Sequence, residues 1–528
     1  MMITAQNARS ASPTPDDVRA QVERMTASTT FANSPQLSAF LLFVVEAELR
    51  GKGERLKGYT IGVEVLRRDV SFDPQIDPIV RVEATRLRRA IERYYSGPGA
   101  SDTVIVDLPR GGYVPRFHWR ETAKVAPVVA PIETSRAFTG NGLPTLRVAP
   151  FVVAGEPGDI VVDGDSLSVK LCEAFALFDA INVVAAAPAG GNGRVDYRLD
   201  GTVEYRGDGR AALRFRLIDK SDETVLWSRV IERPADADAV AFERGVILEL
   251  ATTVVEPYGI IWANDRARHL SSDAGDPRYR ALIHAGEAFR SFDIEDHAQA
   301  RAELEQLTAA DPSFATGFSY LSIIYAREYQ YGYAGRSDGA APLDRALRVA
   351  RRGVELKPQS ARAYHLLSIV LFYRGEIDAA CATADRAIAM NPYDLLMRSD
   401  YGGRLIFAGE IERGMEILQR TIEVGVVMPP WTHFYLFLGH YLRDELPEAR
   451  YQAGQLTTEA YLYGLIARAL VTYRDGQIDD ARHAADAILE LQPEWGTDAR
   501  RELGKMITDG KLADRLAHDL AAAGLKNE

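Results

Sequence analysis

The sequence predicts a multidomain chain of the α plus α/β class. A helical N-terminal unit ends in a β-hairpin, a small α/β unit follows, and a helical solenoid completes the chain. Three observations lead to this prediction. The chain has 528 residues, which is too long for one hydrophobic core. The middle of the chain alternates apolar and polar residues with period two, and positions after residue 275 recur every 34 residues.

Composition indicates an ordinary soluble protein, with 47% hydrophobic and 26% charged residues. The N-terminus lacks the apolar core of a secretory signal, and the most apolar short stretch, residues 37–49, contains Glu46 and Glu48 and is too short to cross a bilayer. The two cysteines, Cys172 and Cys381, each lie in an apolar helical pattern and are expected to be reduced thiols rather than a disulfide. We therefore expect a cytoplasmic protein without a membrane span.

The N-terminal segment shows a fixed order of predicted elements. We expect residues 1–14 to be disordered and residues 15–118 to form helix, helix, short helix, long basic helix and β-hairpin. Ser34 and Pro35 mark the start of the second helix, because a side-chain N-cap followed by proline favours a helix N-terminus. A Pro/Gly turn separates the two alternating runs of the hairpin.

The long basic helix carries five arginines between Arg81 and Arg93. Its apolar residues recur with helical spacing and predict a buried stripe of Val80, Ala84, Leu87, Ile91 and Tyr94. Guanidinium groups on the other side suit phosphates and guanine edges, although a basic helix alone is more often a solvated surface. The candidate DNA-contacting residues of this helix are Arg81, Thr85, Arg86, Arg88, Arg89 and Arg93.

Charge is distributed unevenly along the chain. Residues 1–120 contain 17 basic and 14 acidic residues, a balance of +3, whereas the whole chain has a net charge of −12 and the remainder therefore −15. This asymmetry indicates a polyanion-binding head on an acidic body.

Two motifs carry a resemblance to a known family. The stretch "IVRVEATRLRRAIE" resembles the recognition helix of the OmpR/PhoB-type winged helix, "YTIGVEVLRR" fits the preceding helix, and "VDLPRGGYVPRF" resembles the wing. The resemblance implies binding to double-stranded DNA and adds the wing residues Arg110, Gly111, Tyr113 and Arg116 as candidates. The proline-containing loop "DVSFDPQIDP" departs from the family pattern and leaves the angle between the two helices open.

Residues 119–142 are rich in Pro, Ala and Thr and are predicted to be a linker, and residues 143–265 read as an α/β unit. With a Gly201–Val203 step and a Leu226–Trp227 pair, this unit resembles the TolB N-terminal-like domain. The whole order resembles a bacterial family of winged-helix, TolB-like and tetratricopeptide-repeat regulators, some of which are called adenylate-cyclase-like. No cyclase segment, phosphate loop, HExxH helix or serine elbow occurs, so we expect no enzyme, no cofactor and no metal.

Residues 275–528 show the 34-residue period, for example between Pro358 and Pro392 and between Gly375 and Gly409. About six stacked helix pairs are predicted, with a concave face that binds a protein or peptide. Tyr329, Tyr331 and Tyr333 are the candidate partner-binding residues, unless they belong to a plain surface insertion.

The sequence thus favours a DNA-binding transcription regulator whose repeats bind a protein partner, with either a homodimer or that partner raising its affinity for DNA. The alternative is a non-enzymatic scaffold in which the winged helix makes protein contacts. An enzyme with unrecognised chemistry in the middle unit is a third, weaker alternative.

Overall fold

The computed structural model divides into two compact units, residues 1–133 and residues 134–528. The boundary falls within the stretch expected to be a linker. The structure describes residues 13–28, 31, 35–66, 79–96, 98–99, 102–109, 112–119, 142–155, 163–185, 195–205, 210–234, 237–269, 275–291, 294–332, 341–423, 428–456 and 461–525.

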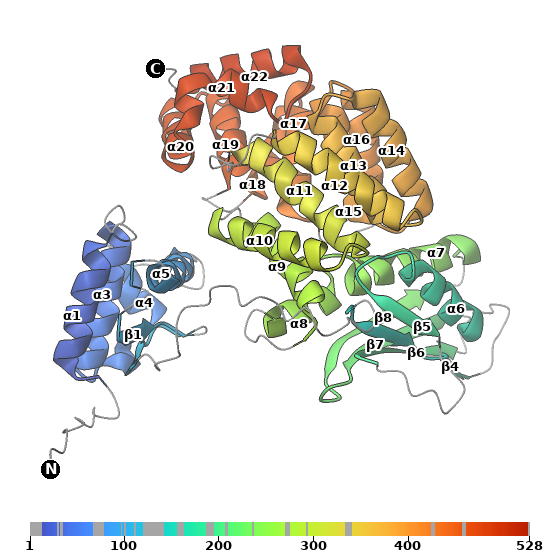
Figure 1. Cartoon of the computed structure of the whole chain (residues 1–528), viewed down its shortest axis with the longest axis horizontal. Coiled ribbons are helices and arrows are strands. Elements are labelled where there is room, and N and C mark those ends of the chain that lie inside the picture. Colours follow the sequence, from blue (N-terminus) through green and yellow to red (C-terminus); the bar gives the residue numbers. More distant parts are fainter. Residues whose placement is uncertain are drawn as a thin grey trace. The chain divides into compact units, whose positions relative to one another are not determined.

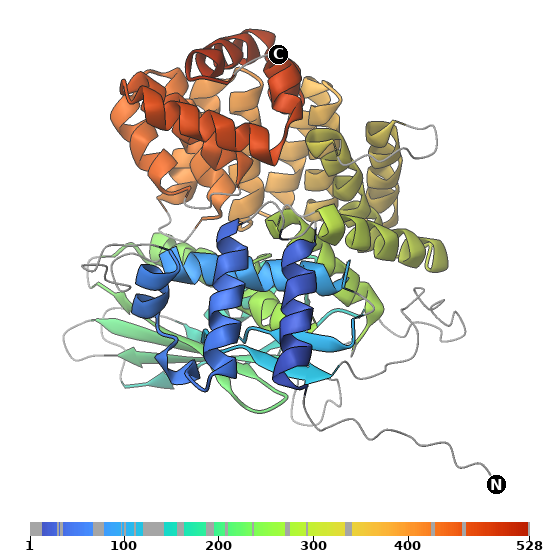
Figure 2. The ribbon, with the colours of Figure 1, turned by 90° about the vertical axis from the view of Figure 1, so that its left-hand side faces the viewer.

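The first unit combines helices with one two-stranded antiparallel sheet (Figures 1 and 2). Its helices are α1 (Pro15–Ala27), α3 (Pro35–Leu49), η1 (Gly53–Arg55), α4 (Gly58–Glu64) and α5 (Ile79–Ser96), and its strands are β1 (Val104–Asp107) and β2 (Arg116–Trp119). Thr14 and Asp17 form a capping box at the start of α1, which explains why the helix begins at that proline. In Figure 2 the two dark-blue helices α1 and α3 lie side by side.

The core of the first unit is built on the apolar stripe of α5. The five residues of the predicted stripe are all buried, and they pack against apolar residues of α1, α3 and β1. Gln21 on α1 donates to Asp102 at 2.7 Å, and Tyr94 on α5 donates to the same carboxylate at 2.5 Å. This shared acceptor ties α1 and the end of α5 to the start of the hairpin.

The second unit begins with a mixed sheet in the strand order β5-β3-β6-β7-β8, in which β4 also pairs with β6. Its strands are β3 (Thr145–Val148), β4 (Val152–Ala154), β5 (Asn182–Ala185), β6 (Tyr197–Tyr205), β7 (Ala211–Asp219) and β8 (Val225–Arg233). The pairings of β3 with β5 and β6 are parallel, and β6, β7 and β8 form the antiparallel run predicted from the period-two pattern. Helices α6 (Gly164–Phe175) and α7 (Ala239–Leu250) bury their apolar residues against this sheet.

Asp163 is the N-cap of α6 and accepts hydrogen bonds from the amides of Asp165 and Ser166. Among the described residues no group of three or more His, Cys, Asp or Glu side chains is arranged to hold a metal ion. Cys172 and Cys381 are free and half-buried.

The apolar stretch of residues 238–263, which the sequence alone favours as one long helix, is interrupted. A π-helical turn, η2 (Ala251–Val255), follows α7, and the chain then breaks from helical geometry before α8 (Ile260–His269). The segment Ala239–His269 is long and apolar enough to cross a membrane by composition, but 61% of its most apolar window is buried inside this fold. Its apolar residues form part of the α/β core.

The rest of the second unit is a stack of antiparallel helix pairs. The helices are α9 (Pro277–Ser291), α10 (Ile294–Ala310), α11 (Ala315–Tyr331), α12 (Pro342–Leu356), α13 (Ala361–Tyr373), α14 (Ile377–Met390), α15 (Leu395–Phe407), α16 (Ile411–Ile422), α17 (Pro430–Leu442), α18 (Leu446–Gly454), α19 (Leu462–Arg474), α20 (Ile478–Leu491), α21 (Glu494–Gly504) and α22 (Gly510–Ala522). The described residues therefore contain seven pairs, whereas the sequence predicted about six. The difference arises because the C-terminal pairs depart from the 34-residue spacing by which pairs are recognised in the sequence. Figures 1 and 2 show the pairs stacked in chain order from α9 to the red α22.

The α/β part and the helix pairs meet at a polar junction. Asp179, after α6, accepts hydrogen bonds from Lys357 at 2.5 Å and from the Ser360 hydroxyl at 2.6 Å. Glu256, between η2 and α8, accepts from the backbone amide of Leu396 at 2.9 Å. The junction thus joins the loop after α6 and the connection after η2 to the helix pairs.

Candidate functional site

The residues predicted to contact DNA lie on α5 and the hairpin, but the structure describes only some of their side chains. Arg81, Thr85, Arg86, Arg89 and Arg93 all belong to α5, and their side chains lie outside the described set, as do Arg110 and Gly111 entirely. Arg116 is exposed on β2, and Tyr113 is half-buried against the core of the first unit.

Arg88 has a role that its helical phase did not predict. Its guanidinium is half-buried, and it donates to the carbonyl oxygens of Leu108 at 2.9 Å, Pro109 at 3.2 Å and Gly112 at 2.7 Å. The donors of Arg88 are therefore directed to the hairpin turn, which gives this side chain a positioning role that the sequence did not predict. Its expected contact with a base stays a prediction.

Tyr95, two helical turns after Arg88, makes a second attachment of α5 to the hairpin. Its hydroxyl donates to the Val104 carbonyl at 3.1 Å and accepts from the Val106 amide at 2.8 Å. Because Arg88 holds the turn and Tyr95 holds the first strand, the hairpin lies at a fixed position beside the arginine-rich helix.

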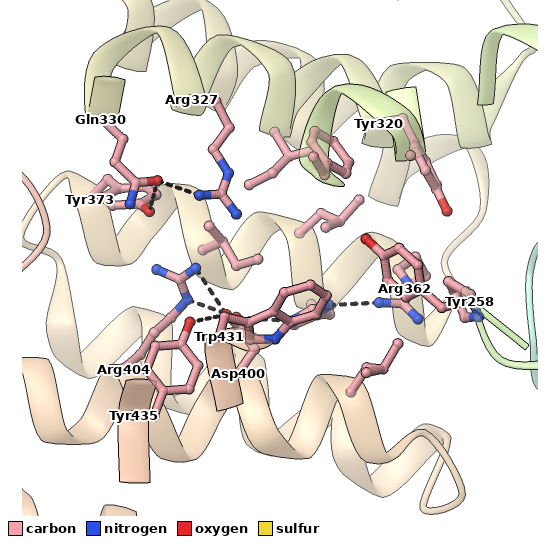
Figure 3. A pocket seen from close by; sticks show the side chains of 18 of the residues that line it. Tyr258, Tyr320, Arg327, Gln330, Arg362, Tyr373, Asp400, Arg404, Trp431 and Tyr435 are labelled. Atoms are coloured by element: carbon pink, nitrogen blue, oxygen red, sulfur yellow. Dashed lines mark hydrogen bonds and ion pairs between the residues drawn. The ribbon is translucent and has the colours of Figure 1, made fainter. Parts of the chain in front are cut away.

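The second unit contains a cavity of about 120 Å³ on the first helices of successive pairs, with a polar cluster in a largely apolar lining. Helices α9, α11, α13, α15, α17 and α19 line it, together with the connection Pro257–Trp262 from the α/β part. Figure 3 shows Arg327 on α11 facing Asp400 and Arg404 across this space. A buried water needs roughly 10–15 Å³ by this measure, so the volume matches a small molecule or one large side chain.

Asp400 is the acceptor at the centre of the cavity's polar cluster. Arg404 binds it in a fork, with Nε to Oδ2 at 2.7 Å and Nη2 to Oδ1 at 3.1 Å, and the Tyr435 hydroxyl donates to Oδ1 at 3.0 Å. Burial opposes ionisation of this carboxyl, but Arg404 and His365 outweigh it and hold the pKa of Asp400 well below its usual range. The charges of Asp400 and Arg404 therefore match each other (Figure 3).

His365 connects this pair to a second one. Its Nε2 lies 3.1 Å from Asp400 Oδ2, and its Nδ1 lies 3.2 Å from Arg362 Nη1. An arginine can only donate, so Nδ1 accepts and the proton of the neutral imidazole is on Nε2. Burial lowers the pKa of His365, which agrees with this neutral tautomer. Arg362 in turn is paired with Asp394 at 2.6 Å.

Arg327 differs from the other two arginines. Its Nη1 donates to Gln330 Oε1 at 2.7 Å and to the Tyr331 hydroxyl at 2.8 Å, which are both uncharged groups. Among the described residues no carboxylate lies within ion-pair distance of it, and its buried Nε has no hydrogen-bond acceptor there. The cavity therefore holds one cation whose charge is not matched by a described side chain.

Tyr258 contributes a strained backbone at the edge of the cavity. Its φ of +85° lies in a region that bulky residues rarely adopt, at a cost of about 1–3 kcal/mol. This conformation places its ring against Trp431, with the centroids 5.5 Å apart and the planes at 61° (Figure 3).

The three tyrosines predicted to line a partner groove have different locations. Tyr329 and Tyr331 belong to the last turn of α11, so this part of the stretch is helix and not a surface insertion. Tyr331 lines the cavity and Tyr329 packs 6.2 Å from the ring of Tyr373, whereas Tyr333 lies outside the described residues.

Sequence reasoning missed Arg327, Arg362, His365, Asp400 and Arg404. One signal was present in the sequence. Together with Arg398, the side chains of Asp400 and Arg404 interrupt the mainly apolar "LLMRSDYGGRLIF". Arg362 and His365 interrupt "ARAYHLLSIVLFY" in the same way. A charged residue inside an apolar helix is rarely buried unless it has a partner, so these interruptions indicate buried polar groups that meet across helices.

The helix pairs decide the class of the repeat region, since α13 and α15 begin 34 residues apart and each is followed by its antiparallel partner. The repeat region is a tetratricopeptide-type α-solenoid. Neither protein-family models nor curated proteins match this chain.

Three solved structures with matching helices are similar to parts of the chain. PilW, a type IV pilus biogenesis factor, has 20% identity and a TM-score of 0.30, and the match covers 40% of this chain and 94% of PilW. The APC/C hetero-tetramer Cut9–Hcn1 has 13% identity and a TM-score of 0.34, and the match covers 54% of this chain and 57% of that one. The C-terminal part of a TPR repeat-containing protein from Cytophaga hutchinsonii has 15% identity and a TM-score of 0.26, and the match covers 48% of this chain and 97% of that one.

Proposed function

We propose that this chain is a non-enzymatic, DNA-binding transcription regulator, in which the first unit binds double-stranded DNA and the solenoid receives a partner. The observation that carries the proposal is the attachment of the hairpin to the arginine-rich helix by Arg88 and Tyr95. A winged helix needs this arrangement, because the recognition helix and the wing must contact DNA together.

Sequence and charge support the same function. The helix α5 carries five arginines, and residues 1–120 are basic while the rest of the chain is acidic. Arg116 is exposed on the second strand of the hairpin, where a guanidinium suits a backbone phosphate. Since the acidic remainder repels DNA, we expect a homodimer on paired half-sites, or a partner held by the repeats, to supply additional affinity.

The test measures the DNA affinity of the full chain across a salt series. The natural chain is compared with the variants Arg89→Ala and Arg93→Ala, and Arg420→Ala serves as the control. Arg420 lies on the outer helix α16 and is 72% exposed. We expect the affinity to fall with salt in the natural chain, because bound phosphates release counterions, and to fall further in the α5 variants but not in the control. The absence of DNA binding even at low salt would contradict the proposal.

The second candidate is a protein-interaction scaffold without DNA binding. The tetratricopeptide-type solenoid favours it, since stacked helix pairs present extended surfaces to protein partners. In that case the arginines of α5 would serve protein contacts. Their substitution would weaken capture of the protein partner, and the natural chain itself would not bind DNA.

A further inference from the structure

The cavity on the repeat helices has the composition of a small-molecule site. About half of the residues that line it are aromatic, and polar side chains converge on it from three helices. Apolar walls with a few placed polar groups are typical of sites that bind small organic ligands. The aromatic side chains that line it include Trp262, Phe289, Tyr320, Tyr373, Trp431 and Tyr435.

The unused hydrogen-bonding capacity of the cavity consists of donors. Arg327 Nε, Arg404 Nη1 and Trp262 Nε1 are buried, and none has an acceptor among the described residues. An unused buried donor is unfavourable, and a ligand that supplies oxygen acceptors removes this penalty. The ligand should therefore be rich in acceptors.

The charge balance of the cavity indicates a single negative charge. Arg404 is matched by Asp400 and Arg362 by Asp394, so Arg327 alone lacks a carboxylate partner among the described residues. A monoanion matches that one charge, whereas a dianion would face the carboxylates of both pairs without a second free cation. A carboxylate also accepts two parallel hydrogen bonds from a guanidinium.

We infer that the cavity binds a small aromatic monocarboxylate, with the carboxylate on Arg327 and the ring among the aromatic side chains. The ring stacks on planar neighbours, and the volume of about 120 Å³ limits the ligand to one or two rings. The inferred ligand site does not depend on DNA binding. An experiment can therefore contradict the ligand site and leave the proposed function standing, or contradict the proposed function and leave the ligand site standing.

In the experiment the full-length chain is titrated with phenylacetate. The heat of binding and the fluorescence emission of Trp262 and Trp431 are measured. Phenylacetamide keeps the ring without the charge, acetate keeps the charge without the ring, and phenyl phosphate carries a second charge. We expect saturable binding of phenylacetate, and binding of the other three compounds that is at least about tenfold weaker. Equal affinity for phenylacetamide, or tighter binding of phenyl phosphate, would overturn the assignment.

Substitutions then locate the site. Arg327→Gln keeps hydrogen-bonding groups but removes the charge, and we expect it to weaken phenylacetate binding by about ten- to a hundredfold, whereas Arg420→Gln on an outer helix leaves it unchanged. Unaltered affinity in Arg327→Gln refutes the proposed position of the carboxylate. If that variant does not fold, as judged by circular dichroism, the comparison of phenylacetate with phenylacetamide on the natural chain decides.

Discussion

Replacing Arg88 with Ala tests whether this side chain positions the hairpin. The guanidinium makes three hydrogen bonds to carbonyl oxygens of the turn, at 2.7–3.2 Å. A hydrogen bond to a charged group contributes about 1.5–3 kcal/mol when buried, but here one half-buried guanidinium makes all three and water can replace part of them. We therefore expect the attachment of the turn to lose about 1–3 kcal/mol in total.

Amide hydrogen exchange of residues 104–119 in the full-length chain measures this loss. Since 1.4 kcal/mol corresponds to a factor of ten, exchange of the hairpin amides should become about five to 150 times faster in Arg88→Ala. Arg116→Ala is the matched control, because Arg116 is exposed on the same hairpin and should leave exchange unchanged.

DNA binding separates the positioning role of Arg88 from base recognition. A displaced wing weakens binding to all sequences alike, whereas the loss of a base contact changes the preferred sequence by about 1–3 kcal/mol at one position. If Arg88→Ala alters sequence preference and leaves hairpin exchange as it was, the positioning role is wrong.

Three further outcomes test the charges of both units. Arg116→Ala should weaken binding to DNA of every sequence and make the slope of log affinity against log salt shallower by about 1. An unchanged slope would contradict the expected contact between Arg116 and a phosphate. Asp400→Asn should leave the Arg404 guanidinium buried without a counter-charge and destabilise the chain by about 3–5 kcal/mol in thermal or denaturant unfolding, and a variant as stable as the natural chain would contradict the pairing. Burial and the nearby Asp394 raise the pKa of Glu256 well above its ordinary value. The protonated Glu256 therefore stabilises the folded chain fully below the ordinary pKa of a glutamate, and this stabilisation is lost as the pH rises through the raised pKa. Glu256→Gln should therefore be more stable than the natural chain at high pH and similar at low pH, and identical pH profiles of unfolding would refute this.

Periodicity in the sequence predicted the parts of the fold that one element determines by itself. The stripe from Val80 to Tyr94 is buried as its helical spacing indicated, and the period-two run became β6, β7 and β8. The solenoid followed from a 34-residue spacing that each helix pair repeats. These features depend on neighbouring residues in the chain, so the sequence contains them directly.

Features that depend on two distant elements were not predictable in this way. Helical phase placed Arg88 on the outer face of α5, but the carbonyls that hold it belong to a turn some 20 residues later. The cavity combines Arg327, Arg404 and the connection near Tyr258, and only the stacking of the helices brings them together. The break after η2 had a local signal in Pro257 and Gly259, which the apolar pattern of the flanking residues obscured.

The junction argues against a middle unit that acts as an independent spacer. Asp179 and Glu256 attach it to α13 and α15, the helices that carry His365, Asp400 and Arg404. The same connection that contains Glu256 continues into Tyr258, whose strained backbone holds its ring on Trp431 at the cavity. A side chain held in a costly conformation stays there only while its contacts persist. A ligand in the cavity would therefore act on contacts that join the two parts, and a signal received by the repeats would pass to the α/β part through this connection.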